Sequence, residues 1–264
     1  MAKVRVDEVE LFYRESGQGE PIVFHHAHAA AHDSWDEILE AIGDRYRCIA
    51  LDARGVGESD RPDEPSTIET MAADVVGLAD ALGLEKFVYV GHSLGGVVGF
   101  ELALRHPARL SKLVLEAPGP ADGGTFPAAL RDYLIRQWRD RDRASMIRDR
   151  QLGIARRHAH RLIEAGVDRA LSASAGHYEG SLRALGAFRR RDELHAIQTP
   201  TLMIAGAADG LLEANLADFA RLGNATLHVF SRVSHAIHRE VPGEFTAVLL
   251  DFFEHGVVRA APRA

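Results

Sequence analysis

The sequence has 264 residues, 46% of them hydrophobic and 26% charged, with a formal net charge of −7, as expected for one globular domain or for one domain that carries an insertion. The negative charge argues against a nucleic-acid partner, and no apolar run reaches the roughly 18 residues that a membrane-spanning helix needs. The single cysteine, Cys48, excludes an internal disulfide and lies in an apolar run that predicts a buried, unreactive thiol.

Short apolar runs alternate with segments of helical periodicity along most of the chain. Apolar runs bounded by turn-forming residues predict strands, and apolar residues three and four positions apart predict helices. The predicted elements are, in chain order, strands over 3–6, 9–16 and 21–24, a helix over 34–43, a strand over 47–52, a helix over 67–83, a strand over 87–90, a helix over 94–107, strands over 111–118, 200–206 and 225–230, and a helix over 244–256. Residues 258–264 are predicted to form a frayed tail.

Side chains that accept a hydrogen bond from a free backbone N–H are predicted to mark two helix starts. Ser34 is the predicted N-cap of the first helix, where Glu37 completes a capping box. Thr67 or Ser66 is the predicted N-cap of the second helix.

The alternation of strands and helices predicts a mainly parallel sheet with helices on both faces. The hairpin at the start of the chain adds an antiparallel edge to this sheet. Residues 119–198 interrupt the alternation with helical sequence and no clear strand. We therefore predict a core domain made of residues 1–118 and 199–264, and a helical cap made of residues 119–198.

The predicted cap differs in charge from the rest of the chain. It holds fifteen Arg and ten Asp or Glu, a net of +5, so the remainder carries −12. One interpretation is a set of solvated helix faces with paired charges, and the other is a basic lid that favours an anionic substrate. The apolar residues Tyr133, Leu134 and Trp138 are expected either to pack on the core or to line a substrate cavity, and Trp138 is our candidate for substrate binding.

A serine flanked by glycines follows the predicted strand over 87–90, in the stretch YVGHSLGGVV. Ser93 lies at a sharp turn into a helix, where Gly91 and Gly95 leave room for the chain to pass. The backbone N–H of Leu94 then points at the group that the serine attacks. A structural glycine-rich turn is the alternative interpretation of this stretch.

Gly91 to Gly95 match the G-x-S-x-G nucleophile elbow, and the sequence resembles the α/β-hydrolase family over residues 5–257. The stretch LDARGVGESD at 51–60 resembles a second segment of that family. The resemblance implies an α/β-hydrolase fold, with a mostly parallel eight-stranded sheet, helices on both faces and a helical cap inserted after strand 6.

The resemblance also implies a catalytic Ser93 followed along the chain by an acid and a histidine. Asp209, in a G-x-x-D segment after the strand over 200–206, matches the acid, and His235, after the strand over 225–230, matches the histidine. His238 and Glu116 are the competing base and acid.

The family places a second oxyanion donor after its third strand, in a His-Gly-x segment. Here His26 matches the histidine, Ala27 replaces the glycine and His28 supplies the N–H, so the expected oxyanion donors are Leu94 and His28. His26 is expected to bond local backbone. The side chain of His28 is expected to face the pocket, where it binds substrate or donates a proton near neutral pH.

Four histidines at positions 25, 26, 28 and 32 crowd this loop. They lack the cysteine or carboxylate set of a zinc site, and residues of one short loop rarely surround one ion. We therefore expect no metal and no other cofactor.

A serine nucleophile implies acyl transfer to water, and we expect a serine hydrolase that cleaves a small carboxylic ester or lactone through an acyl-enzyme. The aspartate nucleophile of relatives that open epoxides or remove halogens is missing. A C–C bond hydrolase or a cofactor-free oxygenase or lyase would use the same residues, and a non-catalytic ligand receptor is a third alternative.

No signal peptide is evident, so we expect a cytoplasmic protein with a small-molecule substrate and no membrane or nucleic-acid partner. Whether the protein forms a homodimer is left open.

Overall fold

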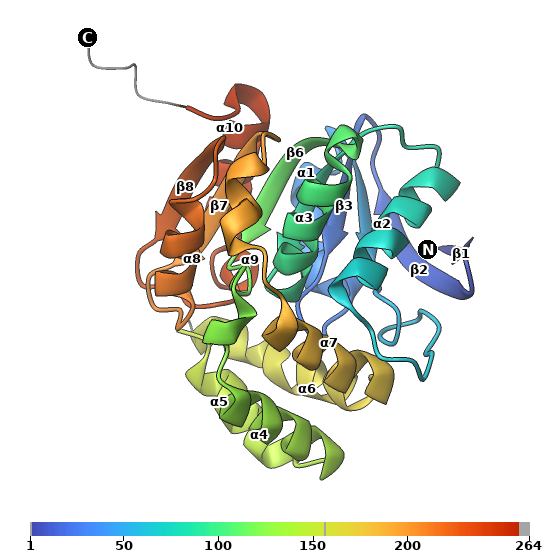
Figure 1. The fold of residues 1–264 in the computed structure, drawn as a ribbon, viewed down its shortest axis with the longest axis vertical. Helices are drawn as coiled ribbons and strands as arrows, with labels where there is room; N and C mark the ends of the chain where they lie inside the picture. Colours follow the sequence, from blue (N-terminus) through green and yellow to red (C-terminus); the bar gives the residue numbers. More distant parts are fainter. Residues whose placement is uncertain (1, 156, 259–264) are drawn as a thin grey trace.

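The computed structural model describes residues 2–155 and 157–258 and contains an eight-stranded sheet (Figure 1). The strands lie in the order β1-β2-β4-β3-β5-β6-β7-β8. Their bounds are β1 Ala2–Val6, β2 Val9–Ser16, β3 Glu20–His25, β4 Tyr46–Leu51, β5 Phe87–His92, β6 Leu110–Glu116, β7 Thr201–Gly206 and β8 Ala225–Phe230. Strand β2 pairs antiparallel with β1 and β4, and every other pair is parallel. The predicted eight-stranded, mostly parallel sheet is confirmed. The frayed tail was predicted over residues 258–264, and residues 259–264 lie outside the described residues.

Helices cover both faces of the sheet, as predicted. Their bounds are α1 Asp36–Ile42, α2 Ile68–Ala81, α3 Leu94–Arg105, α4 Ala128–Arg139, α5 Arg143–Leu152, α6 Ile163–Leu171, α7 Ala175–Ala187, α8 Leu212–Phe219, α9 Ile237–Glu240 and α10 Pro242–His255. Buried side chains of α2 and α3 pack on one face, and those of α1 and α10 pack on the other. None of the helices in the described ranges is both long and apolar enough to cross a membrane.

The helices α4 to α7 follow β6 and precede β7, so they form the segment for which a cap was predicted. Figure 1 shows these helices together beyond one end of the sheet. Their buried residues, among them Met146, Val167 and Tyr178, belong to the same hydrophobic cluster as Val97 and Phe100 of α3. The inserted helices therefore share a core with the sheet domain, and burial of this shared apolar surface holds them in place.

The two predicted helix starts have different outcomes. Thr67 accepts a hydrogen bond from the N–H of Thr70 at 3.1 Å, so this N-cap is confirmed. The prediction for Ser34 is wrong, because its hydroxyl donates to the carbonyl of Ala31 at 2.8 Å and a short 3₁₀ helix, His32–Trp35, leads into α1. The local sequence favours a cap at Ser34, but a tertiary contact to the preceding His32 sets the path of the chain.

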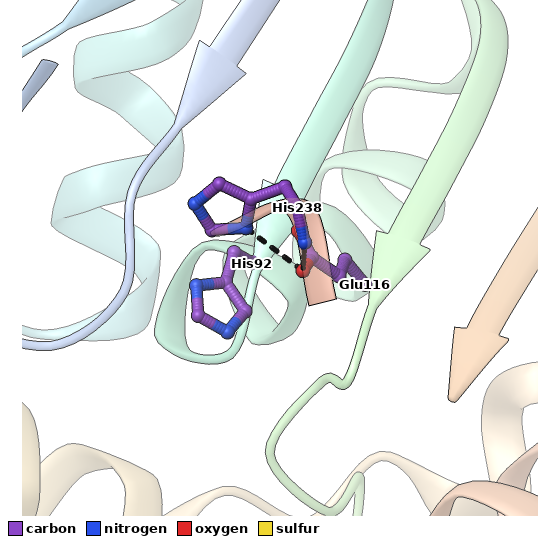
Figure 2. A group of neighbouring side chains, drawn as sticks. All are labelled: His92, Glu116 and His238. Carbon is purple, nitrogen blue, oxygen red and sulfur yellow. Dashed lines mark hydrogen bonds and ion pairs between the residues drawn. The ribbon is translucent and has the colours of Figure 1, made fainter. Parts of the chain in front are cut away.

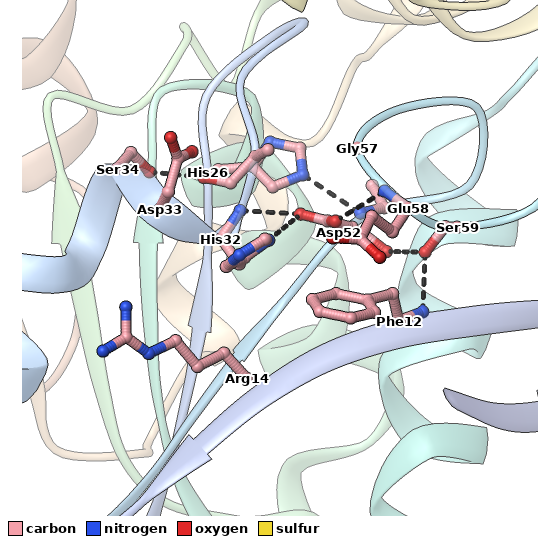
Figure 3. A network of polar contacts seen from close by, with 12 residues as sticks. Phe12, Arg14, His26, His32, Asp33, Ser34, Asp52, Gly57, Glu58 and Ser59 are labelled. Atoms are coloured by element: carbon pink, nitrogen blue, oxygen red, sulfur yellow. Dashed lines mark hydrogen bonds and ion pairs between the residues drawn. The ribbon is translucent and has the colours of Figure 1, made fainter. Parts of the chain in front are cut away.

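That contact is made by Asp52, a buried aspartate directly after β4 (Figure 3). Its carboxylate accepts hydrogen bonds from the backbone N–H of His32 at 2.7 Å, from Nδ1 of His32 at 2.9 Å and from the N–H of Glu58 at 2.9 Å. The hydroxyl of Ser59 donates to the Asp52 carbonyl at 2.7 Å and accepts from the N–H of Phe12 at 2.8 Å. One carboxylate therefore joins the loops that follow β3 and β4.

The charges of Asp52 and His32 stabilise each other. Burial disfavours the charged form of His32, but the hydrogen bond to Asp52 and its negative charge raise the pKa of this histidine. Burial alone would raise the pKa of Asp52, but the His32 contact and the backbone donors lower it. Because both shifts favour the ion pair, the contact stabilises the fold between these two pKa values.

We predict that Asp52→Asn lowers the free energy of unfolding by about 1–3 kcal/mol at pH 6, because an amide presents one acceptor oxygen to three partly buried donors. The contribution from His32 is fully present below its unfolded-state pKa of about 6.5 and is lost as the pH rises through its raised folded-state pKa. The contribution from Asp52 is lost as the pH falls through its lowered pKa. Urea denaturation between pH 2 and 9 measures both limits. Glu58→Gln is the control, because only the backbone N–H of this exposed residue bonds to Asp52. Equal stability of the two variants would contradict the prediction.

Candidate active site

Ser93 has a strained backbone between β5 and α3. Its φ of 54° and ψ of −108° are rare for a residue with a side chain and cost on the order of 1–3 kcal/mol. A Cβ on Gly91 would lie 2.2 Å from the carbonyl oxygen of Gly95, and a Cβ on Gly95 would lie 2.5 Å from the carbonyl oxygen of His25. The Ser93 N–H donates to the carbonyl of Glu116 at 2.9 Å. Both glycines are therefore required by contacts of the backbone, for the reason that the sequence indicated.

Ser93 and His235 line the same cavity, which has a volume of about 420 Å³. Ala27 and His28 from the loop after β3 also line it, together with side chains from α4, α5, α6 and α7. The Ser93 hydroxyl forms no hydrogen bond with a residue in the described ranges. The bond from a catalytic serine to its base is often long in a free enzyme and shortens only when substrate is bound.

Asp209 and His235 form a hydrogen-bonded pair at the carboxyl edge of the sheet. Asp209 follows β7, His235 follows β8, and His235 Nδ1 lies 2.8 Å from Asp209 Oδ2. The side chain of Asp209 is 7% exposed and that of His235 is 30% exposed. Because Nδ1 donates to the carboxylate, Nε2 of His235 is left to accept a proton in the cavity.

The electrostatics of this pair favour an imidazolium beside a carboxylate. Burial opposes ionisation of His235, but the hydrogen bond and the charge of Asp209 raise its pKa. Burial also opposes ionisation of Asp209, but the His235 contact and the N–H of Leu211 lower its pKa. This is the arrangement expected of a general base and the acid that orients it.

The competing residues His238 and Glu116 pair with each other (Figure 2). Glu116 Oε1 accepts hydrogen bonds from the backbone N–H and from Nδ1 of His238, at 2.9 and 2.8 Å. The two side chains are 0% and 1% exposed, and the His238 ring stacks on Trp35 with centroids 4.3 Å apart. The structure thus brings Asp209, and not Glu116, to His235.

His92, Glu116 and His238 form the one group in the described part of the chain whose donor atoms could hold a metal ion, because these atoms lie within 4.8 Å of one another (Figure 2). Burial lowers the pKa of His92 to about 3 and that of His238 well below its ordinary value, so both rings are neutral. His92 Nε2 donates to the carbonyl of His235 at 2.9 Å. Hydrogen bonds occupy His92 Nε2, His238 Nδ1 and Glu116 Oε1, whereas Glu116 Oε2 and His238 Nε2 have no partner among the described residues. Through the His92 contact, the cluster supports the loop that carries His235.

The predicted oxyanion donors lie on two separate elements next to Ser93. Leu94 is the first residue of α3, so its N–H has no partner within the helix. His28 lies on the loop after β3, and its ring Nε2 donates to the carbonyl of Tyr178 at 3.0 Å. Burial lowers the pKa of His28 to about 4. Its ring is therefore neutral at pH 7, which argues against the alternative in which His28 acts as an acid near neutral pH.

The other histidines of this loop have separate backbone or carboxylate partners and do not converge. Nδ1 of His25 donates to the carbonyl of His26 at 3.0 Å. Nδ1 of His26 donates to the carbonyl of Ala27 at 2.7 Å, and its Nε2 accepts from the N–H of Ala53 at 3.0 Å. His26 therefore bonds local backbone, as predicted, and these contacts hold the loop against the end of β4.

Trp138 occupies a different place from the one predicted. It is not among the residues that line the cavity. Its ring stacks on that of Tyr178 with centroids 4.9 Å apart, and its Nε1 donates to the carbonyl of Ala170 at 3.0 Å. Trp138 supports Tyr178, which does line the cavity. The prediction missed this because helical periodicity distinguishes a buried face from a solvated one, but it does not show which buried neighbour a side chain contacts.

Sequence reasoning missed Tyr178, Arg150 and Arg239, all of which line the cavity. Arg150 was one arginine among many in the predicted cap, and no local pattern separates it from the others. Arg239 lies on α9, which begins two residues after His235. Its closeness to His235 along the chain is the one signal that could have placed it near the active site.

Comparison with known proteins agrees with this geometry. The family model of the alpha/beta hydrolase fold matches residues 20–241. The chain is 31% identical to a non-heme haloperoxidase of Rhodococcus erythropolis, over 94% of this chain and 97% of the relative. It is also 31% identical to a 2-hydroxy-6-oxononadienedioate/2-hydroxy-6-oxononatrienedioate hydrolase of Paraburkholderia xenovorans, over 94% of this chain and 92% of the relative.

Among solved structures, an N-acyl homoserine lactone degrading enzyme superposes with a TM-score of 0.83 at 26% identity, over 95% of this chain and 100% of that one. The sheet order, the strained Ser93 and these matches lead to one conclusion: the chain belongs to the α/β-hydrolase family.

Proposed function

We propose that the protein is a serine hydrolase that cleaves a small carboxylic ester or lactone. The observation that carries the proposal is the 2.8 Å hydrogen bond between His235 Nδ1 and Asp209, in a histidine that lines one cavity with the strained Ser93. A serine hydroxyl is a weak nucleophile at neutral pH without such a base. The lactone-degrading and dioate-hydrolysing relatives support hydrolysis as the reaction class.

In the proposed mechanism, Ser93 Oγ attacks the carbonyl carbon while His235 Nε2 accepts the hydroxyl proton. Asp209 keeps the proton of Nδ1 in place and stabilises the imidazolium that forms. The negative charge that develops on the carbonyl oxygen is bound by the N–H groups of Leu94 and His28. The tetrahedral intermediate collapses when His235 protonates the departing alcohol, and a water molecule activated by His235 then hydrolyses the acyl-enzyme.

The oxyanion donors are supported by the way their backbone is held. Leu94 opens α3, whose partial positive charge at the N-terminus adds to the attraction for an anion. The loop of His28 is anchored by His26 to Ala53 and by His32 to Asp52. Donors fixed before the reaction stabilise charge without reorganisation, and one such donor is worth about 10²–10³ in turnover.

Hydrolysis of a carbon–carbon bond next to a ketone is the second candidate. The relative that acts on 2-hydroxy-6-oxo dioates, 31% identical over 94% of this chain, favours it. The same Ser93, His235 and Asp209 would serve, so the substrate distinguishes the two candidates. Turnover of a vinylogous 1,5-diketone acid without turnover of nitrophenyl esters would favour the second candidate.

We predict that Ser93→Ala lowers kcat for short-chain 4-nitrophenyl esters by about 10⁶-fold, to the limit of detection, because the nucleophile is removed. The same variant should lose covalent labelling by a fluorophosphonate probe, which intact-mass spectrometry detects. Ser172→Ala, at an exposed serine outside the cavity, is the control and should keep both signals. A wild-type protein that is neither labelled nor active would favour a ligand receptor.

We predict that Asp209→Asn lowers kcat/KM by about 10⁴-fold and moves its acid limb to lower pH. His235 must be neutral to act as the base, so activity rises as the pH passes through its pKa. The Asp209 carboxylate raises that pKa above the ordinary value of 6.5, and its removal reverses the shift. Rate profiles between pH 5 and 9 measure the limb, with the exposed pair residue Asp251→Asn as the control. An acid limb at the same pH in both variants would show that Asp209 does not act on the base.

A further inference from the structure

The wall of the cavity next to Ser93 is mostly apolar, but one region of it is positively charged. Three arginines line it, Arg150 on α5, Arg169 on α6 and Arg239 on α9. One carboxylate in the described ranges lines it, that of Asp149, which accepts hydrogen bonds from Tyr133 and Gln137. The positive charge in the cavity therefore exceeds the negative charge.

Most arginines of the inserted segment are neutralised by carboxylates elsewhere. Those with an ion pair are Arg131, Arg139, Arg143, Arg161, Arg169, Arg183, Arg189, Arg190 and Arg191. The interpretation of this segment as helix faces with paired charges thus applies to most of its length. Among the cavity arginines, Arg169 is paired with Asp33.

Arg150 and Arg239 differ from these, since the side chain of neither forms a hydrogen bond or ion pair with any residue that the structure describes. Burial lowers the pKa of Arg150, and the positive charges of Arg239 and Arg169 add to this effect. Both arginines are partly buried. A partly buried guanidinium without a counter-ion has lost hydration that no protein group replaces, so it would attract an anion that enters the cavity.

The inserted helices leave room for the Arg150 guanidinium. Gly166 lies within α6, where glycine costs about 1 kcal/mol relative to alanine. A Cβ at this position would lie 3.0 Å from Nη1 of Arg150. The absence of a side chain at Gly166 therefore lets the guanidinium lie against the helix at the cavity wall.

The unpaired charges act close to the reacting groups. The charge of Arg150 lowers the pKa of His28, whose N–H is a proposed oxyanion donor. Arg239 follows His235 on the same short segment. Burial lowers the pKa of its guanidinium, and the negative charges of Asp33, Glu37 and Glu116 act in the opposite direction. A substrate bound at Ser93 is thus within electrostatic reach of both arginines.

We propose that Arg150, assisted by Arg239, binds a carboxylate carried by the substrate, so that the enzyme prefers esters or lactones with a free acid group over neutral ones. This inference rests on the proposed hydrolase function and names its substrate class. A guanidinium binds a carboxylate through two parallel N–H···O bonds. The apolar side chains of Leu134, Met146 and Ile163 would pack against the body of such a substrate.

A carboxylate fits the cavity better than a phosphate does. A phosphate group carries up to two charges and is usually held by several backbone N–H groups at a helix start. Here the unpaired positive charge comes from two side-chain guanidiniums, those of Arg150 and Arg239, in mostly apolar surroundings. One planar carboxylate on an apolar chain matches that arrangement.

Two matched pairs of esters test the preference. Mono-4-nitrophenyl adipate and 4-nitrophenyl hexanoate differ by a carboxylate on the acyl side, and 4-acetoxy-3-nitrobenzoate and 2-nitrophenyl acetate differ by one on the alcohol side. We expect kcat/KM of the wild type to favour the carboxylate ester at least about tenfold in one pair, and to fall with added salt for that ester. In Arg150→Gln the preference should fall about 10- to 100-fold, mainly through KM. No preference in either pair, or a preference kept by Arg150→Gln, overturns the proposal.

Arg148→Gln is the matched control, because it removes one exposed arginine of the same helix that does not line the cavity. It should leave the preference of the wild type unchanged. Arg150→Lys keeps the charge but not the two parallel donors, so an intermediate preference is expected. Since Arg150 has no structural counter-ion, Arg150→Gln should keep or raise the melting temperature. A clear fall would instead indicate a structural role.

A binding measurement separates this inference from the proposed function. Ser93→Ala protein should bind at least one of the two carboxylate esters in calorimetry, and the Ser93→Ala, Arg150→Gln double variant should bind that ester at least about tenfold more weakly. If the wild type turns over none of the four esters while this binding difference holds, the hydrolase proposal fails and the carboxylate site stands. If Ser93 supports turnover but the two variants bind equally, the carboxylate site fails and the hydrolase proposal stands.

Discussion

The close approach of three backbone segments around Ser93 is the constraint on which the rest of this structure depends. The chain must turn from β5 into α3 within one residue, and that residue has a left-handed φ of 54°. Gly91 and Gly95 permit the turn because a Cβ on either would lie within 2.5 Å of a carbonyl oxygen. The N–H of Ser93 is held by β6. Strain at this point is tolerated because the surrounding sheet fixes the strand ends.

The loops that face Ser93 are held by buried charges and polar groups beneath them. Asp52 joins the loop after β3 to the loop after β4 through its three acceptor contacts. His92 donates to the carbonyl of His235 and lies against the Glu116–His238 pair. These anchors include hydrogen bonds to backbone atoms of the loops, so they set the positions of the loops, and Ser93 and His235 line the cavity.

The inserted helices contribute a wall whose charge is unevenly compensated. Ion pairs such as Arg139–Glu179 and Arg143–Asp168 tie neighbouring helices together on the exposed side. Exposed pairs of this kind are worth about 0–1 kcal/mol each, so packing of the shared apolar cluster holds the insertion. Stability of the insertion therefore does not require an ion pair at Arg150, which lines the cavity.

Much of this protein follows from its sequence alone, because periodicity and short-range chemistry act over a few residues. The eight strands, their mostly parallel order and the strained turn at Ser93 all result from local patterns and from the handedness of strand–helix–strand connections. The predicted order of Ser93, Asp209 and His235 is a property of the chain, and their meeting depends on the carboxyl ends of parallel strands sharing one edge.

Tertiary structure alone decided which of several similar residues meet. The path of the chain into α1 follows from a contact of His32 with Asp52, 20 residues away, and not from the capping tendency of Ser34. Trp138 lies behind Tyr178, and Arg150 lacks the counter-ion that its neighbours have, because packing between helices sets those distances. The types of the residues and their spacing can be read directly from the sequence. Burial and charge compensation depend on partners that lie far apart along the chain and become neighbours only when it folds.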